Sequence, residues 1–272
     1  MLDEIIESTG ALARELSVVG LINIQYAIKD GLLFVLEVNP RASRTVPFVS
    51  KATGVPLAKI ALKLMLGGRL ADFKLEKMKE MPYIAVKEAV LPFSKFPGAD
   101  TILTPEMKST GEVMGIAEHF GESFFKAETA AGDPLPVGGT IFLSINQQSK
   151  EALLHEMKLL NELGYTLVAT EGTARFLNGH GIPCRRVFKV SEGRPNIVDL
   201  IKNGEIDLII NTPTGKIPKH DAFTIRQAAL RYRMPIITTI SAAKAAVQGL
   251  IEIKKKKDIT VKSIQEYHAE VR

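Results

Sequence analysis

The chain has 272 residues, of which 46% are hydrophobic and 24% charged, a composition that excludes an intrinsically disordered protein and allows two domains of ordinary size. Its formal net charge of +5 is dispersed along the sequence, so it suits phosphate-bearing ligands but predicts no nucleic-acid partner. No segment approaches the roughly 20 apolar residues that cross a bilayer, and the acidic start is unlike a signal peptide, so we expect a cytoplasmic protein with no membrane partner. The single cysteine, Cys184, excludes a disulfide framework and is expected to be a small buried side chain.

The first half of the chain opens with apolar residues at helix-like spacing, from Leu2 to Leu16. Two strands are expected next, and Asp30-Gly31 between them is typical of a hairpin turn. The predicted strands cover 21–28 and 32–38, and they are followed by short helices over 43–53 and 56–66, a strand over 83–91, a loop over 92–105 and a helix over 121–131. A linker rich in glycine and proline follows at 132–136, and we place a domain boundary there, which gives domains of 1–132 and 133–272.

After this linker, short apolar strands alternate with helical patterns. The strands are expected over 140–145, 166–169, 184–187, 208–211 and 236–239, and the helices over 150–163, 173–178, 197–202 and 222–233. Such alternation predicts an α/β domain with a parallel five-stranded sheet that helices cover on both faces. The lysine run at 254–257 is expected to form a solvated turn before a strand.

Polar side chains at the end of the second strand form the first candidate site. Glu37 and Asn39 are two residues apart on this strand, so their oxygens point to one face, as Mg²⁺ prefers. The register of the hairpin decides whether Gln25 joins them. A two-residue turn would direct Gln25 away, whereas a three-residue loop centred on Gly31 would set it opposite Glu37, and we expect the latter.

Two arginines follow this strand end. Arg41 and Arg44 come directly after Pro40, where their guanidinium groups can hold phosphate oxygens. The residues alone leave an alternative open, because a carboxylate and two arginines at a strand end also suit a surface ion-pair cluster.

Three runs of sequence closely resemble carbamoyl phosphate synthetase, a family of ATP-grasp enzymes. The runs are EVNPRASRTVPFVSKATG over 37–54, PFSKFPG over 92–98 and PEMKSTGEVMG over 105–115. The resemblance implies that residues 1–132 are the carboxy-terminal part of an α+β ATP-grasp domain. It also implies that Gln25, Glu37 and Asn39 hold Mg²⁺ or Mn²⁺ with ATP, and that Arg41 and Arg44 are catalytic, contacting the phosphoryl groups in transfer.

The same resemblance implies an ATP-dependent ligase of pyrimidine and arginine biosynthesis. An ATP-grasp needs a preceding lobe with a glycine-rich loop, which this sequence does not contain, so the chain alone is expected to be inactive. The expected partners are the remainder of the large subunit, the glutaminase small subunit and a nucleotide effector. Either a longer polypeptide or a split gene would give such a chain.

The strand predicted over 166–169 leads into a turn at Thr170, Glu171, Gly172 and Thr173, which forms the second candidate site. Hydroxyl groups and a glycine before a helix offer free backbone N–H groups to an anion, although an ordinary helix cap has the same pattern. Further polar residues come at the ends of neighbouring strands, where the ligands of an open α/β sheet bind, namely Ser144 with Lys150, Lys189 with Arg194, and Asn211.

The second half is also similar to the methylglyoxal synthase-like fold, a Rossmann-like domain that binds allosteric nucleotides in the synthetase family. The resemblance implies an effector such as UMP, an inhibitor, or IMP, an activator. It implies that the effector contacts Ser144, Lys150, Thr170, Gly172, Thr173, Lys189 and Asn211. Pro213 departs from the family pattern, because a proline stands where a threonine hydroxyl is expected.

A second effector site and two alternative functions complete the predictions. Glu88 and Thr238 match positions of an ornithine site in the family, but Ile236 replaces an expected tyrosine. A methylglyoxal synthase-like lyase would need aspartates where Pro195 and Thr214 stand, and it would keep Asp221 alone. A stand-alone nucleotide-binding regulatory module is the other alternative.

Overall fold

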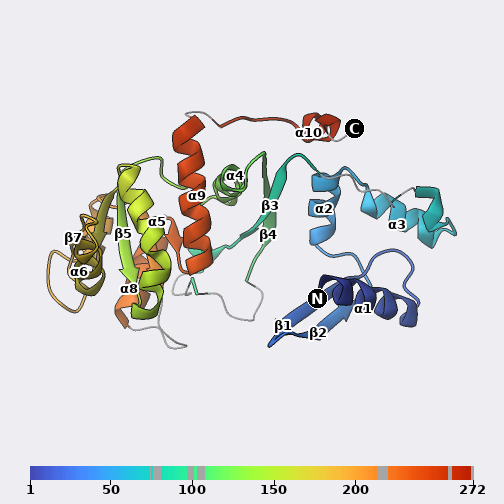
Figure 1. The fold of residues 1–272 in the computed structure, drawn as a ribbon, viewed down its shortest axis with the longest axis horizontal. Coiled ribbons are helices and arrows are strands. Elements are labelled where there is room, and N and C mark those ends of the chain that lie inside the picture. Colours follow the sequence, from blue (N-terminus) through green and yellow to red (C-terminus); the bar gives the residue numbers. More distant parts are fainter. Residues whose placement is uncertain are drawn as a thin grey trace. The chain divides into compact units, whose positions relative to one another are not determined.

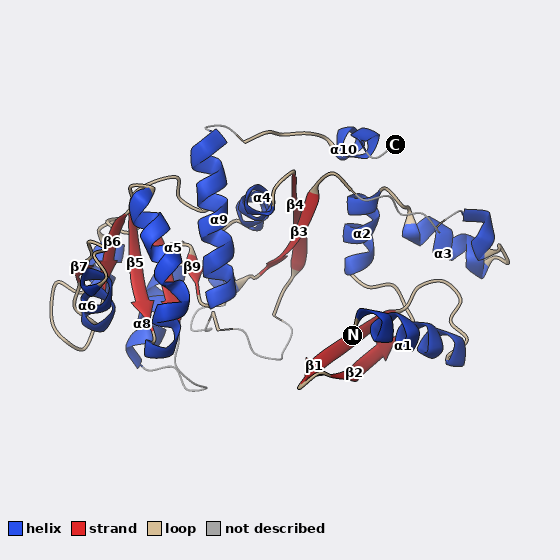
Figure 2. Ribbon diagram, in the orientation of Figure 1, coloured by secondary structure: helices blue, strands red, loops and turns tan. Residues whose placement is uncertain are grey.

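The structure, a computed structural model, describes residues 1–73, 75, 81–96, 101–102, 108–212, 220–256 and 259–270 (Figures 1 and 2). The chain divides into two compact units. The first consists of 1–82 together with 262–272, and the second consists of 83–261. Each unit is described below by itself.

The first unit contains a hairpin and several short helices. In chain order its elements are α1 (Leu2–Glu15), β1 (Asn23–Lys29), β2 (Leu32–Asn39), α2 (Thr45–Thr53), α3 (Leu57–Met65), the 3₁₀ helix η1 (Leu70–Phe73) and α10 (Ile264–Glu270). Helix α10 comes last in sequence but packs on α2, where Nε2 of His268 donates to the carbonyl oxygen of Lys51 at 2.6 Å. The first unit is therefore discontinuous in sequence.

In the β1–β2 hairpin Gln25 pairs with Glu37 as predicted, but a register shift brings them together and not the expected turn length. Lys29 pairs with Leu32, so the loop has two residues, and Asp30 and Gly31 both have positive φ, of 53° and 77°. The expected three-residue loop is therefore wrong. Gln25 nevertheless lies opposite Glu37, because the register shifts by one residue between Gln25 and Tyr26.

The second unit is built around a parallel sheet, with an antiparallel strand pair beside α4. In chain order its elements are β3 (Ile84–Val90), η2 (Phe93–Lys95), β4 (Gly111–Ala117), α4 (Phe120–Ala131), β5 (Thr140–Ile145), η3 (Gln147–Ser149), α5 (Lys150–Glu162), β6 (Thr166–Ala169), α6 (Glu171–Gly179), β7 (Arg185–Arg186), α7 (Ile197–Lys202), β8 (Leu208–Thr212), α8 (His220–Arg231), β9 (Ile236–Ile237) and α9 (Ile240–Lys256). The sheet order is β7-β6-β5-β8-β9, and all of its pairs are parallel. The predicted five-stranded α/β fold is confirmed.

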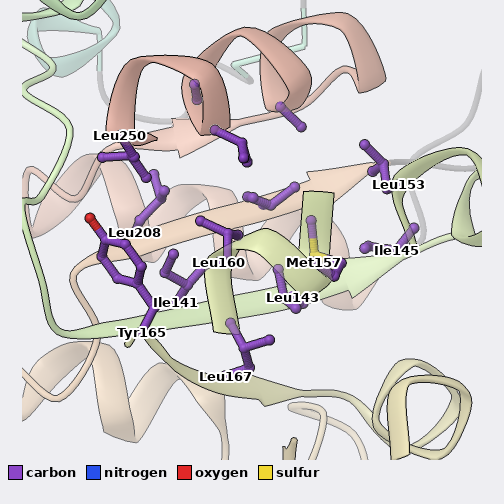
Figure 3. Packing of buried hydrophobic residues seen from close by; sticks show 14 of the residues in the cluster. Ile141, Leu143, Ile145, Leu153, Met157, Leu160, Tyr165, Leu167, Leu208 and Leu250 are labelled. Carbon is purple, nitrogen blue, oxygen red and sulfur yellow. The ribbon is translucent and has the colours of Figure 1, made fainter. Parts of the chain in front are cut away.

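Two hydrophobic cores cover the two faces of this sheet. On one face, Ile141 and Leu143 of β5 pack with buried residues of α5, α6 and α9, as Figure 3 shows for Met157, Leu160 and Leu250. On the other face, the alternate residues of β5, β6 and β8 pack with α7 and α8, and they are Phe142, Val168 and Ile209. The alternation follows from the two-residue period of a strand. Cys184 is buried in the first core, as predicted.

Helix α4 joins the β3–β4 pair to α9. The Ser123 hydroxyl donates to the carbonyl oxygen of Ile84 at 2.8 Å, and the backbone of Gly121 lies against that of Gln248 on α9. This packing assigns β3 and β4 to the second unit, so the chain passes from the first unit to the second between residues 82 and 83. The boundary expected at 132–133 lies inside the second unit. As a boundary between family domains, it stays a prediction.

Helix α9 corrects one prediction. The lysine run expected to form a turn before a strand lies in the last turn of α9 as far as Lys256, while Lys257 falls outside the described residues. The apolar residues of α9 face the core, and its lysines reach other elements, since Nζ of Lys256 lies 2.7 Å from Oε2 of Glu122 on α4. Among the helices that the structure describes, including this one of 17 residues, none could span a membrane.

Candidate functional site

The hairpin of the first unit brings three of the predicted ligands to one face. Gln25 and Glu37 are directly opposed, and such pairs project to the same side of a sheet. Asn39 follows Glu37 by two residues, and its Nδ2 donates to Oε1 of Glu37 at 3.0 Å. Gln25 and Glu37 are exposed, so the face is accessible in this unit.

This set of donors fits a hard divalent cation. Its members offer carboxylate and amide oxygens, which Mg²⁺ and Mn²⁺ accept together with phosphate oxygens. The described residues contain no group of three or more histidines, cysteines, aspartates and glutamates that could hold a metal by themselves. The metal role of Gln25, Glu37 and Asn39 therefore stays a prediction.

The two arginines follow at the start of α2. Arg41 is exposed, and its Nη1 donates only to the neighbouring carbonyl oxygen of Ala42, at 3.1 Å. Arg44 occupies the N-cap position of α2. Oε1 of Glu37 accepts from Asn39, and Arg41 makes no ion pair with Glu37 among the described residues.

The second unit gathers three predicted residues at the carboxyl ends of its central strands. Ser144, Thr170 and Asn211 each lie two residues beyond a strand residue of the core that α7 and α8 cover. Ser144 and Asn211 are directly paired, and the backbone N–H of Thr170 donates to the carbonyl oxygen of Leu143 at 3.3 Å. The three polar side chains therefore follow the same face of the sheet to its end.

The turn before α6 is an unusual helix start. Thr170 is the N-cap residue, yet its side chain makes no capping hydrogen bond, and Gly172 lies in the first turn. Thr173, in contrast, is committed to the fold, because its hydroxyl donates to the carbonyl oxygen of Ile145 at 3.3 Å and accepts from its N–H at 3.2 Å. Of the two predicted hydroxyls in this turn, that of Thr170 is the one with no bond to the helix.

Lys150 at the start of α5 is the most enclosed of the basic residues predicted for this site, with 7% of its surface exposed. Its Nζ donates to the carbonyl oxygen of Gly172 at 2.8 Å and to Oε1 of Gln147 at 2.9 Å. An ammonium group has three hydrogens, so one remains for a ligand. Burial lowers the pKa of Lys150, because the charged form loses solvation.

The last predicted lysine is held differently. Lys189 follows β7, its side chain is 45% exposed, and its Nζ lies 3.7 Å from Oε1 of Glu192. Arg194 is engaged by Asp199 at the start of α7, with its Nη2 at 2.7 Å from Oδ1. No contact among the described residues links Lys189 to Lys150, so its part in the site stays a prediction. Pro213 and Thr214 lie outside the described residues.

Sequence reasoning missed a buried arginine at this edge. Arg226 on α8 is fully buried, and its Nη1 donates to Oδ1 of Asn211 at 3.3 Å. The available signal was its place in the helix, three residues before the buried Ala229. This spacing puts a charged side chain on the face of α8 that packs on the sheet.

Glu88 and Thr238 lie around one cavity of about 540 Å³ in the second unit, and Ile236 lines the same cavity. Glu128 and Asp133 add two carboxylates to its wall. Burial and the neighbouring charges of Glu88 and Asp133 raise the pKa of Glu128 to about 8. The structure thus brings the two residues of the predicted second effector site together, while their role stays a prediction.

Known proteins similar to this chain are large chains of one enzyme. The chain is 53% identical over 270 residues to the carbamoyl phosphate synthase large chain of Archaeoglobus fulgidus, which covers 99% of this chain and 25% of the relative. It is 47% identical over 283 residues to the carbamoyl phosphate synthase large chain, C-terminal section, of Methanocaldococcus jannaschii, with 100% of this chain and 46% of the relative covered. The chain belongs to the carbamoyl phosphate synthase large-chain family. It spans a quarter to a half of the length of these two relatives.

Two domain families match separate parts of the molecule. Residues 2–73 match the carbamoyl-phosphate synthase L chain, ATP binding domain, and they fall within the first unit. Residues 152–238 match the MGS-like domain and fall within the second unit. The candidate metal face lies within the first match, and Thr170, Lys189 and Asn211 of the candidate anion site lie within the second.

Among solved structures, a methylglyoxal synthase from Elizabethkingia anophelis NUHP1 is similar to part of this carbamoyl phosphate synthase family member. It is 20% identical, its TM-score is 0.35, and the match covers 42% of this chain and 79% of that one. The residues disfavour a lyase of this kind here. Pro195 has no proton to transfer, and Asp221 is engaged by the Ser191 hydroxyl at 2.6 Å.

Proposed function

We propose that the chain forms part of an ATP-dependent carbamoyl phosphate synthase. In this proposal the hairpin of the first unit contributes metal and phosphate ligands for the phosphorylation of carbamate. The second unit binds a nucleoside monophosphate, of the UMP or IMP type, which regulates that reaction. The proposal rests on the identity of about half of all residues to synthase large chains over the whole sequence.

The hairpin suits a role in phosphoryl transfer because its oxygen donors and its arginines are complementary. Glu37 with Gln25 and Asn39 would hold Mg²⁺ or Mn²⁺, which neutralises charge on the nucleotide phosphates when it is bound. Arg41 and Arg44, beyond the end of β2, would hold the phosphoryl group in place through charge-assisted hydrogen bonds.

A substitution of Glu37 tests the catalytic part of the proposal. We expect that Glu37→Gln, in an assembled synthase carrying these residues, abolishes phosphorylation of carbamate but leaves the bicarbonate-dependent half-reaction active. The amide keeps the size of the side chain but removes the charge that a metal requires. Glu15→Gln, at the exposed end of α1, is the matched control and should leave both reactions unchanged. An unchanged overall rate in Glu37→Gln would exclude a metal role for this residue.

One observation carries the regulatory part of the proposal, namely hydrogen-bond donors that have no acceptor among the described residues at one end of a parallel sheet. Lys150 has one hydrogen left, the Thr170 hydroxyl does not cap its helix, and α6 begins there with its positive dipole end. A phosphate group accepts from all three kinds of donor.

Thermal unfolding of the 272-residue chain tests this site, since a ligand that binds only the folded state raises its melting temperature. We expect UMP or IMP to stabilise the wild type. Loss of the Lys189 ammonium should weaken nucleotide binding by about tenfold or more. Lys158→Ala, an exposed lysine on α5, removes the same charge elsewhere and is the control. Equal shifts in Lys189→Ala and the wild type would remove Lys189 from the site, whereas no shift in any variant would contradict the effector function.

The proposed partners are the remainder of the large chain and a glutaminase subunit. The hairpin supports the first of these, because it exposes a series of large apolar residues, namely Ile28, Leu32, Phe34, Val35 and Leu36. Exposed apolar area of this kind usually marks an interface. The relatives are two to four times longer than this chain, so they contain the additional segments that could cover it.

The proposal leaves room for a second effector in the cavity of the second unit. Glu88 and Thr238 would bind a small cationic ligand such as ornithine, and the carboxylates of that cavity favour a positive charge. Ile236 offers no hydroxyl there, so such a ligand would lack one hydrogen bond that the family resemblance implies.

A further inference from the structure

The buried pair Arg226–Asn211 determines which end of an amide faces the ligand site. A guanidinium group has donors and no acceptor, so the atom of Asn211 that lies 3.3 Å from Nη1 of Arg226 must be the oxygen Oδ1. Nδ2 is then on the other side of the side chain. In the part of the chain that the structure describes, neither hydrogen of Nδ2 has a protein acceptor, although Asn211 is only 2% exposed.

Because Asn211 lies at the carboxyl end of the sheet, the orientation of its amide decides which atom faces the candidate site. Asn211 pairs with Ser144 at the carboxyl end of the sheet, on the face where Thr170 also lies. Among the described residues, Nδ2 is not one of the buried side-chain atoms that lack a hydrogen-bond partner, so its hydrogens remain open to water or to a ligand. The residues around it are donors as well, since Lys150 and the start of α6 both present hydrogens.

We propose that Arg226 is a positioning residue, which fixes Asn211 as a donor toward the site and so makes the site select a hydrogen-bond acceptor. This inference rests on the proposed effector function and adds a chemical requirement to it. The group that meets Asn211 must carry a lone pair and no competing hydrogen, as a phosphate oxygen or an ether or carbonyl oxygen of a nucleoside does. Both oxygen sources belong to one class of ligand, a nucleoside monophosphate.

The decisive variant is Asn211→Asp, which keeps the shape of the side chain. Its carboxylate should pair well with Arg226, so the unliganded chain should unfold at the same temperature as the wild type or higher. Where wild-type Asn211 offers the Nδ2 donor to the ligand, the carboxylate of the variant offers an acceptor oxygen. Affinity for UMP and IMP, measured by calorimetric titration of the 272-residue chain, should fall by about tenfold or more. Asn161→Asp, near the end of α5 on the opposite side of the sheet, adds the same charge and should bind as the wild type.

Inorganic phosphate, titrated in parallel, identifies which oxygen Asn211 meets. If Asn211→Asp loses binding of both phosphate and nucleotide, the acceptor is on the phosphate. If it loses only the nucleotide, the acceptor is on the nucleoside. Unchanged nucleotide affinity in Asn211→Asp would overturn the inference, while the wild type would still bind. A wild type that binds no nucleotide would instead contradict the proposed function.

A double-mutant cycle tests that Arg226 acts through Asn211. Arg226→Met should weaken nucleotide binding by about tenfold in the wild type but cause no further loss in the Asn211→Ala background, because the residue it positions is then absent. Arg226→Lys keeps a donor and should recover part of the affinity. Equal losses in the two backgrounds would show that Arg226 acts only on the general fold, and this would overturn its positioning role.

Discussion

The pKa values of two carboxylates on α4, the buried Glu122 and the half-buried Glu128, shift in opposite directions. Burial alone would raise the pKa of Glu122, but hydrogen bonds and charge from Lys256 and Lys126 outweigh it, so the pKa of Glu122 is lowered. The pKa of Glu128 is raised to about 8 by burial and by Glu88 and Asp133. The difference follows from the neighbours, which are ammonium groups in one case and carboxylates in the other.

We expect Glu128→Gln to stabilise the chain at pH 8 and to have little effect near pH 4. Between about pH 4.5 and 8 the folded state keeps a proton that the unfolded chain has released, so wild-type stability falls with rising pH, by at most about 1.4 kcal/mol per pH unit. The glutamine variant has no such proton to lose. Chemical denaturation at several pH values measures the difference, and a constant difference at all pH values would contradict the raised pKa.

Glu122→Gln is the matched control for this prediction, with the opposite sign. A lowered pKa contributes stability that is present above about pH 4.5 and lost as the pH falls through the folded-state pKa. Glu122→Gln should therefore destabilise the chain at neutral pH, and its deficit should shrink below about pH 4.5.

The positions of individual residues of the candidate anion site were partly predictable. Ser144, Thr170 and Asn211 could be placed together because strand ends of a parallel sheet meet at one edge. The place of Arg226 could not be predicted, because its hydrogen bond to Asn211 depends on how α8 packs on β8. The sequence pattern of one helix does not specify this packing. The hydrogen bond between Thr173 and Ile145 could not be predicted either, because it joins residues 28 positions apart.

At the scale of elements, the close approach of α4 and α9 depends on a glycine. A Cβ added at Gly121 would lie 2.5 Å from the carbonyl oxygen of Gln248, closer than such atoms can approach. We expect Gly121→Ala to destabilise the second unit by about 1–3 kcal/mol, because the backbones must separate. Gly179→Ala, where a Cβ meets nothing within 4 Å, is the control and should be neutral or slightly stabilising. Denaturant midpoints compare the two, and equal effects would contradict the close packing.

The hairpin shows why an element can be predicted while its details are not. Asp30-Gly31 correctly predicted the turn, and the two-residue loop then follows from the positive φ of both residues. The bulge that returns Gln25 to Glu37 has no signal in the sequence, because it inserts Leu36, an apolar residue in an apolar strand. The lysine run of α9 was misread for a related reason, since its contacts with Glu122 and Tyr165 are made with distant parts of the chain.

For the whole molecule, the division into two units predicts two unfolding events. We expect calorimetry of the 272-residue chain to show two transitions, of which a bound nucleotide raises only the one that belongs to the second unit. Removal of residues 262–272 should lower only the other, since it deletes α10 with its contact between His268 and Lys51. A single transition that both treatments shift would contradict two separate units.

The discontinuity of the first unit also sets an order of events during synthesis. Helix α2 is made early, but α10, which packs on it, is made only after the whole of the second unit. Until α10 is made, the hydrogen bond between Nε2 of His268 and the carbonyl oxygen of Lys51 cannot form. Once residues 83–261 have folded, their two ends are held at one separation, so the chain no longer has to close a long flexible loop to bring α10 back to α2. Folding of the second unit thus becomes a step in the completion of the first unit.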